Sequence, residues 1–263
     1  MTQNAPAKPT TDTPAWSSDE LASSPHANEQ KADKVRRMFS AIAHAYDLNN
    51  RLHSFGRDQA WRKAAVRLAD VRPTDEVLDM ACGTGDLTRA FADAGAKRVV
   101  GGDFTAPMLD IARTKRLGPA REPDRANIEY VLADAMNLPF EDDSFDVLSI
   151  AFGIRNVAEP DKAFAEFKRV LRPGGRLIVL EFSEPTNPLL RLGNDVWTKR
   201  VMPLTATLIS RDTSGAYAYL PRSIETFLTR EDMTNAMERA GFASVAQRPM
   251  TFGVVVAYRG DAR

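Results

Sequence analysis

The 263-residue chain has a single cysteine, only three histidines and no surplus of charge of either sign. Cys82 alone cannot form an intramolecular disulfide, which is typical of a protein from a reducing compartment. Lysine plus arginine and aspartate plus glutamate number 35 each, so no bulk charge favours nucleic acid as a partner. No apolar run approaches the roughly 18 residues that a membrane-spanning helix needs. The scattered His26, His44 and His53 form no metal-ligand pattern.

The first thirty residues are rich in Pro, Ser, Thr and Ala and contain few apolar anchors. Such a segment buries too little surface to offset the entropy of ordering it, so residues 1–30 are expected to be disordered. The segment has no apolar run of a secretory signal, and its acids and lack of arginine argue against a mitochondrial transit peptide. We therefore expect a cytoplasmic protein whose single folded domain covers residues 31–263.

Beyond residue 30 the hydrophobic period changes once. Between residues 31 and 74 apolar residues recur at helical spacing, which predicts two or three helices before the first strand. From residue 75 onward, short β-rich runs mostly alternate with helical patterns. This alternation predicts a doubly wound α/β fold, in which helices cover both faces of a mainly parallel sheet. The expected strands are EVLDMA, RVVGGD, IEYVLAD, FDVLSIAF and GRLIVLEF.

Residues that favour helix starts and turns support this prediction. Thr105 and Pro107 can begin one helix, Pro160 can begin another, and RPGG (172–175) predicts a turn into the next strand. Residues 185–229 have helical character without a strand pattern, and we interpret them as an insertion over the carboxyl edge of the sheet. Open α/β sheets bind their ligands at that edge. A helix ending at Gly241 and two strands, expected to form an antiparallel hairpin, close the chain.

A glycine-rich turn follows the first expected strand, in VLDMACGTGD (residues 77–86). A nucleoside-triphosphate loop is excluded because no lysine follows Gly83 and Gly85. A dinucleotide is disfavoured because Thr88 stands where close helix packing needs Gly or Ala, and Asp86 would repel a pyrophosphate. A ligand with a carboxylate and a cation but no phosphate fits better, since backbone N–H groups at the turn can hold the carboxylate.

S-adenosylmethionine has these features, and acidic residues mark the ends of three successive strands. Asp103, with Phe104 beside it, can accept both ribose hydroxyls, and Asp134 can accept from the adenine amino group beside the Ala135 backbone. The alternative is that the glycines only form the turn and the aspartates only cap helices. The turn itself would contribute Asp79, Gly83, Thr84 and Gly85 to the cofactor site.

Four stretches together resemble the ubiquinone/menaquinone biosynthesis C-methyltransferases: YDLNNRLHSFGRDQAWR (46–62), LPFEDDSFDVLSIAFGIRNV (138–157), RVLRPGGRLIVLEFSEP (169–185) and YAYLPRSIETF (217–227). The resemblance implies a Rossmann-like, class I methyltransferase that moves a methyl group from S-adenosylmethionine to a ring carbon of a polyprenylated benzoquinol or naphthoquinol.

The resemblance also carries cofactor contacts over to Thr84, Asp103, Asp134 and Ala135, and a further one to Ala151, where the family usually has Ser. The chain departs from the family elsewhere as well. Asn49 stands where Met is common, and Asp58-Gln59 stands where His-Arg is often seen.

Carbon methylation needs an electron-rich ring carbon, which a quinol acquires when one hydroxyl is deprotonated. Arg155 and Asn156 follow the fourth expected strand at the carboxyl edge, and Arg155 could hold the phenolate or a proton-carrying water. The alternative for Arg155 is a surface salt bridge with Glu159 or Asp161. The last two catalytic candidates, which could instead be a helix end tied to the core, are Tyr46 and Asp47.

The insertion is apolar enough to line a channel for an isoprenoid tail. Arg191, Lys199 and Arg200 could meet lipid headgroups, so peripheral contact with the inner face of the membrane, or with a quinone-synthesis complex, is expected. Core packing is the alternative explanation of the same apolar pattern. Two rival functions stay open at this point: another small-molecule O- or N-methyltransferase, and a non-catalytic cofactor-binding scaffold.

Overall fold

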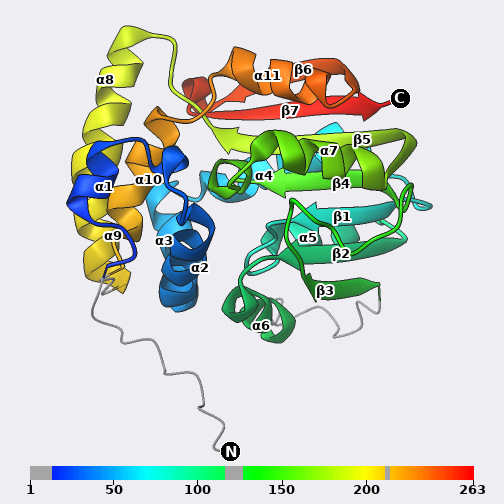
Figure 1. The fold of residues 1–263 in the computed structure, drawn as a ribbon, viewed down its shortest axis with the longest axis horizontal. Coiled ribbons are helices and arrows are strands. Elements are labelled where there is room, and N and C mark those ends of the chain that lie inside the picture. The colour runs from blue at the N-terminus through cyan, green and yellow to red at the C-terminus, as the bar shows by residue number, and fades with distance from the viewer. Residues whose placement is uncertain (1–13, 116–126, 211–213) are drawn as a thin grey trace, which may run out of the picture.

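The computed structural model describes residues 14–115, 127–210 and 214–263, and in these ranges seven strands form one sheet (Figure 1). The strands lie in the order β3-β2-β1-β4-β5-β7-β6. The first five are parallel, whereas β7 runs antiparallel between β5 and β6. This order confirms the doubly wound fold with a C-terminal antiparallel hairpin. The strands are β1 (Glu76–Met80), β2 (Arg98–Asp103), β3 (Ile128–Leu132), β4 (Phe145–Ala151), β5 (Leu171–Phe182), β6 (Phe242–Met250) and β7 (Val255–Ala262).

Helices cover both faces of the sheet because successive strand residues point to opposite sides. On β1, Val77 packs into a core that includes residues of α4 (Arg57–Ala69) and α5 (Asp86–Asp93). The next residue, Leu78, packs into a second core that includes residues of α7 (Pro160–Val170) and α11 (Arg230–Arg239). The continuous apolar strands of the sequence are thus buried on both sides, as a parallel sheet requires.

The two predicted helix starts are confirmed, whereas one predicted turn differs. Thr105 is the N-cap residue of α6 (Ala106–Thr114), and Pro160 is the first residue of α7. The expected turn at RPGG lies inside β5 instead of before it. Leu171 already pairs with Phe145, and the pairing resumes at Arg176 opposite Val147. The four intervening residues bulge out of the strand, because the chain joins the sheet before the turn is made.

A separate group of helices faces the carboxyl edge of the sheet, on the left of Figure 1. The segment before β1 contributes α2 (Lys31–Ile42), η2 (Ala43–Ala45) and α3 (Tyr46–His53). Within residues 14–115, 127–210 and 214–263, no helix is both long and apolar enough to cross a membrane. Residues 185–229 contribute α8 (Pro188–Val196), η4 (Trp197–Val201), α9 (Met202–Ser210) and α10 (Ala216–Glu225).

The expectation of disorder up to residue 30 is wrong for residues 14–30, and residues 1–13 lie outside the described part of the chain. This segment forms α1 (Ser18–Ala22) and η1 (Pro25–Ala27). Trp16 is buried and stacks on Tyr219 of α10 with ring centroids 4.8 Å apart. His26 Nε2 lies 2.9 Å from the Ser223 carbonyl oxygen. A few anchors suffice here because α2 and α10 already provide a surface to pack against.

Candidate functional site

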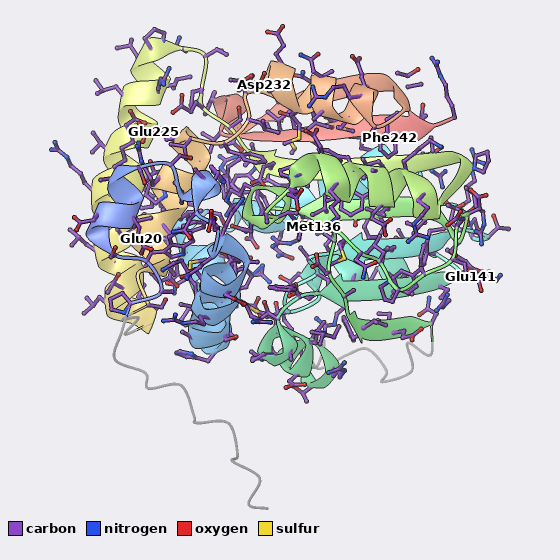
Figure 2. All side chains as sticks on the ribbon, in the orientation of Figure 1. Glu20, Met136, Glu141, Glu225, Asp232 and Phe242 are labelled. Atoms are coloured by element: carbon purple, nitrogen blue, oxygen red, sulfur yellow. The ribbon has the colours of Figure 1, made fainter. Side chains whose placement is uncertain are left out.

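A cavity of about 100 Å³ lies where β1, β2 and β4 end. Its lining also includes residues of α2 and of the loop after β3, where Met136 is labelled in Figure 2. That loop runs from the carboxyl edge to the opposite edge, near Glu141 in the same view. The cavity therefore occupies the position at which the sheet order reverses, between β1 and β4. Its lining contains the predicted residues Tyr46, Gly83, Asp103, Phe104, Asp134, Ala135, Ala151 and Asn156.

A larger cavity of about 270 Å³ adjoins it, between the sheet edge and the helical group. Arg155 lines this second cavity, as do Asn49 and Trp197. Phe39, Tyr46 and Phe152 line both cavities, so their side chains lie at the junction of the two compartments. Two ligands bound side by side would meet at Tyr46 and Phe152.

Asp103 is fixed at the end of β2 by backbone amides. The Gly83 N–H donates to Oδ2 and the Thr105 N–H donates to Oδ1, each at 2.8 Å. Burial raises the pKa of Asp103, and the two amides act in the opposite direction. Each carboxylate oxygen keeps a lone pair, so the side chain can still accept two further hydrogen bonds.

Asp79 and Gly85 line neither cavity and instead support the glycine turn on the side away from the cavities. Asp79 is buried and accepts from Thr88 Oγ1 at 2.7 Å and Ser149 Oγ at 2.6 Å. Burial raises its pKa to about 6, although both hydroxyls lower it. Gly85 (φ 80°) precedes α5, and a side chain on it would collide with Tyr130 of β3. The close approach that this glycine permits is to a neighbouring strand.

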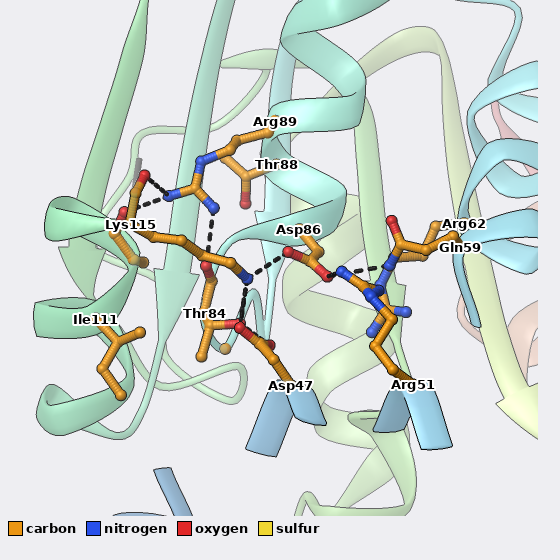
Figure 3. Close-up of polar contacts among 12 residues, drawn as sticks. Asp47, Arg51, Gln59, Arg62, Thr84, Asp86, Thr88, Arg89, Ile111 and Lys115 are labelled. Carbon is orange, nitrogen blue, oxygen red and sulfur yellow. Dashed lines mark hydrogen bonds and ion pairs between the residues drawn. The ribbon is translucent and has the colours of Figure 1, made fainter. Parts of the chain in front are cut away.

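Thr84 and Asp47 also lie outside both linings, in an ion-pair network on the outer side of the turn (Figure 3). Thr84 Oγ1 donates to Asp47 at 2.6 Å, and Lys115 at the end of α6 pairs with Asp47 at 2.6 Å and with Asp86. Arg51 of α3 pairs with Asp86 at 3.0 Å. The network ties α3, and with it Tyr46, to the glycine turn. Lys115 carried no signal in the sequence.

Arg155 is the middle residue of the short helix η3 (Ile154–Asn156) and is buried. Its Nη1 donates to Glu181 Oε1 at 2.6 Å and to the Phe152 carbonyl at 2.8 Å. The alternative considered from the sequence, a surface salt bridge of Arg155 with Glu159 or Asp161, is therefore wrong, and Asp161 pairs with Arg239 instead. Arg155 Nε is buried and has no hydrogen-bond partner among the described residues. Glu181 was missed, although an acid in the apolar run LIVLEF was a signal.

Asn156 holds the loop at the junction of the two cavities. Its Nδ2 donates to the Phe152 carbonyl at 3.2 Å, and its Oδ1 accepts from Tyr219 Oη at 3.0 Å. Phe152 has a φ of 56°, in the left-handed region that is unfavourable for a bulky residue. These contacts fix the loop and keep the Phe152 ring at the junction of the two cavities.

The lining of the smaller cavity fits S-adenosylmethionine. Among the described residues it includes the carboxylates of Asp103 and Asp134 but neither lysine nor arginine. Such a lining suits a cationic ligand and lacks the cations that a pyrophosphate would need. Asp134 uses Oδ1 for the Met136 N–H at 2.9 Å and has Oδ2 available for an amino group. No group of three metal-ligating side chains occurs in the part of the chain that the structure describes.

Comparisons with known proteins agree with this geometry. Residues 26–261 match the ubiE/COQ5 methyltransferase family. The chain is 43% identical to a demethylmenaquinone methyltransferase of Clavibacter sepedonicus, over 88% of this chain and 91% of that protein. It is also 43% identical to the ubiquinone/menaquinone biosynthesis C-methyltransferase UbiE of Pseudomonas savastanoi pv. phaseolicola, over 88% and 90%.

Solved structures support the fold. A methyltransferase in complex with the Trm112 activator of Haloferax volcanii superposes with a TM-score of 0.60, at 22% identity, over 85% of this chain and 97% of that one. A SAM-dependent methyltransferase of Thermotoga maritima gives a TM-score of 0.59 at 20% identity, over 86% and 99%.

Proposed function

The chain belongs to the ubiE/COQ5 methyltransferase family, and on this premise we propose that it methylates a ring carbon of a polyprenylated quinol with S-adenosylmethionine as methyl donor. One observation carries the proposal most directly. Two cavities meet at Tyr46 and Phe152, the smaller lined by carboxylates and the larger by the buried Arg155. This arrangement would bring a sulfonium methyl and a phenolic ring into contact at the shared junction.

In this proposal the smaller cavity holds the cofactor, which supplies an electrophilic methyl group. Asp103 would accept the ribose hydroxyls through the lone pairs that the amides leave, and Asp134 would accept from the adenine amino group. Gly83, Phe104, Ala135 and Ala151 would contribute shape and backbone groups. Asp79, Thr84, Gly85 and Asp47 would act indirectly, by fixing the turn.

The larger cavity would bind the quinol ring, with Arg155 as the residue that touches the reacting oxygen. The guanidinium cannot act as the base, because its pKa exceeds about 12 and it therefore stays protonated. It can instead donate from Nε to the phenolate oxygen and so stabilise the deprotonated ring, whose carbon atoms are more electron-rich than those of the neutral quinol. Glu181 would hold the guanidinium in place through Nη1. Asn156 and Tyr46 would position the ring at the junction of the two cavities.

A tail attached to that ring can leave the larger cavity between α3 and η4. Phe55 and Trp197 both line the cavity with ring centroids 4.9 Å apart, and Phe55 is 73% exposed. From this point an apolar stripe continues over the outer side of α8, η4 and α9. Its residues, which recur at spacings of three, four or eight, are Leu189, Leu192, Val196, Leu204 and Leu208.

We propose that this apolar stripe rests on the surface of the membrane in which the tailed substrate dissolves. Arg57 and Arg200 are exposed near the cavity mouth and form no ion pair with described residues, so they are available to anionic headgroups. Arg191 and Lys199 are less available, since Arg191 pairs with Glu184 and Lys199 with Asp195 and Glu225. A protein of a quinone-synthesis complex is the competing occupant.

Quinone profiling of a deletion strain tests the proposed function in the cell. Loss of the gene should abolish the methylated quinone and accumulate its demethylated precursor. Wild-type protein should restore the profile, and the Arg155→Leu variant should not. An unchanged quinone profile in the deletion strain would refute the assignment.

A further inference from the structure

Asn49 is a buried residue of α3 that lines the larger cavity. Its Nδ2 donates to the Tyr217 hydroxyl, which fixes the amide plane. Its Oδ1 is buried and accepts no hydrogen bond from any described residue. Because a buried carbonyl oxygen without a donor is unfavourable, a ligand that brings a donor to this point gains affinity.

Asn49 lies close to the place where the two cavities meet. It follows Tyr46 by three residues on the same helix, so both side chains lie on one face of α3. Among the described residues that line the larger cavity, Asn49 and Arg155 are the two with a buried side-chain atom that lacks a hydrogen bond. One of these atoms is an acceptor and the other is a donor.

We infer that Asn49 Oδ1 accepts a hydrogen bond from the second ring hydroxyl and thereby makes the enzyme selective for the reduced substrate. The inference rests on the proposed function and specifies how the ring is recognised. A quinol that gives up one proton has a phenolate oxygen for Arg155 Nε and an O–H group for Asn49 Oδ1. The oxidised quinone has only acceptors, so its carbonyl would face Oδ1 with no hydrogen between them. A site built to pair with a substrate hydroxyl rejects the analogue that lacks it.

Binding to the two redox forms tests this inference. The dissociation constants of a short-tailed 1,4-naphthoquinol and of its oxidised quinone are measured anaerobically, with S-adenosylhomocysteine present. Wild-type protein should prefer the quinol. Asn49→Leu should weaken quinol binding by about tenfold or more and leave quinone binding unchanged or stronger. Asn49→Asp, which offers acceptors alone, should keep the preference.

Asn194→Leu is the matched control, because Asn194 also lines the larger cavity but comes from α8. It should not change the preference, and melting curves confirm that each variant is folded. The inference is overturned if Asn49→Leu keeps the wild-type preference, or if Asn49→Asp reverses it, which would place Nδ2 in the cavity. In either case methylation of the quinol by wild-type protein would leave the proposed function standing. Failure to bind or methylate either ring would remove the proposed function itself.

Discussion

At the scale of single residues, Arg155 combines a buried ion pair with an unpaired nitrogen, so its loss should affect stability and turnover separately. Arg155→Leu should lower kcat by about 10²–10³ while cofactor affinity stays nearly intact. The same change leaves Glu181 buried without its partner, which costs about 3–5 kcal/mol of stability. Arg155→Lys should recover little turnover, because a flexible ammonium cannot reproduce the planar fork.

The double variant Arg155→Leu/Glu181→Leu separates the two effects. It removes both buried charges, so much of the stability should return while turnover remains low. Steady-state kinetics, calorimetry with S-adenosylhomocysteine and melting curves give the three quantities. Near-normal turnover in either folded variant would show that Arg155 serves only the fold.

Asp103→Ala should weaken cofactor binding by roughly tenfold to a few hundredfold, because charge-assisted hydrogen bonds contribute about 1.5–3 kcal/mol each. Asp110→Ala is the matched control, since Asp110 is an exposed acid of α6 that pairs only with Arg113 among the described residues. Calorimetric titration with S-adenosylhomocysteine measures both. Equal affinities for the two folded variants would remove Asp103 from the cofactor site.

Asp79 should make the protein less stable as pH rises through the weakly acidic range. Its pKa is raised from 3.8 to about 6 in the folded state, so the folded protein binds more protons between these values. Above pH 6 the loss of unfolding free energy is complete and amounts to roughly 3 kcal/mol. Urea unfolding across this range should show a larger loss in wild-type protein than in Asp79→Asn.

His26 acts in the opposite direction, since burial lowers its pKa from 6.5 to about 4. Its contribution is common to wild-type protein and the Asp79→Asn variant, so the difference between the two pH profiles isolates Asp79. Parallel profiles would mean that Asp79 ionises in the fold as it does in the unfolded chain.

The sequence predicted which residues lie near the glycine turn, but not which of them face the cavity and which point away from it. Gly83, Asp103 and Asp134 lie at or just after the ends of strands and reach the cavity, as such positions do at a carboxyl edge. Thr84 is sequence-adjacent to Gly83, yet it points toward Lys115, more than 30 residues away. Glu181 and Lys115 contact the site only through tertiary packing, which no local pattern encodes.

At the scale of elements, the apolar stripe on α8, η4 and α9 predicts binding to lipid vesicles. Leu204 and Leu208 are 75% and 80% exposed, and replacing both with Glu should reduce binding by about tenfold or more. Co-sedimentation with vesicles of phosphatidylethanolamine and phosphatidylglycerol measures the effect, and high salt should weaken wild-type binding.

Leu132→Glu provides the control for this experiment. Leu132 is also exposed, but it lies on β3 at the edge of the sheet, away from the α8–α9 column (Figure 1). It should bind vesicles like wild-type protein. If wild-type protein ignores vesicles, or if the stripe variant changes only its oligomeric state, the stripe contacts protein and not lipid.

Strands and helices with strong periodicity were predictable, and elements that depend on distant support were not. The strands β1 to β5 could be predicted, because buried parallel strands appear in the sequence as continuous apolar runs. The segment at residues 14–30 has a polar average composition, so its local pattern predicts disorder. Trp16 nevertheless packs into a core cluster that the rest of the chain supplies, and Pro25 is buried as well.

At the scale of the whole molecule, the sheet supplies one cavity and the helices around its carboxyl edge enclose the other. The network of Lys115, Asp47 and Asp86 joins the two parts, because it links α3 to the glycine turn (Figure 3). Tyr46 begins α3 and lines both cavities. Methyl donor and acceptor would therefore be aligned by contacts between the helical group and the sheet.

The most direct test of this account is methyl transfer by the purified protein from methyl-labelled S-adenosylmethionine to a demethylated quinol. Under reducing conditions the label should appear on a ring carbon of the product. Oxidised quinone should react poorly, because its ring carbon is electron-poor and no phenolate can form. Label on oxygen, or equal rates with the reduced and oxidised rings, would contradict carbon methylation of a quinol.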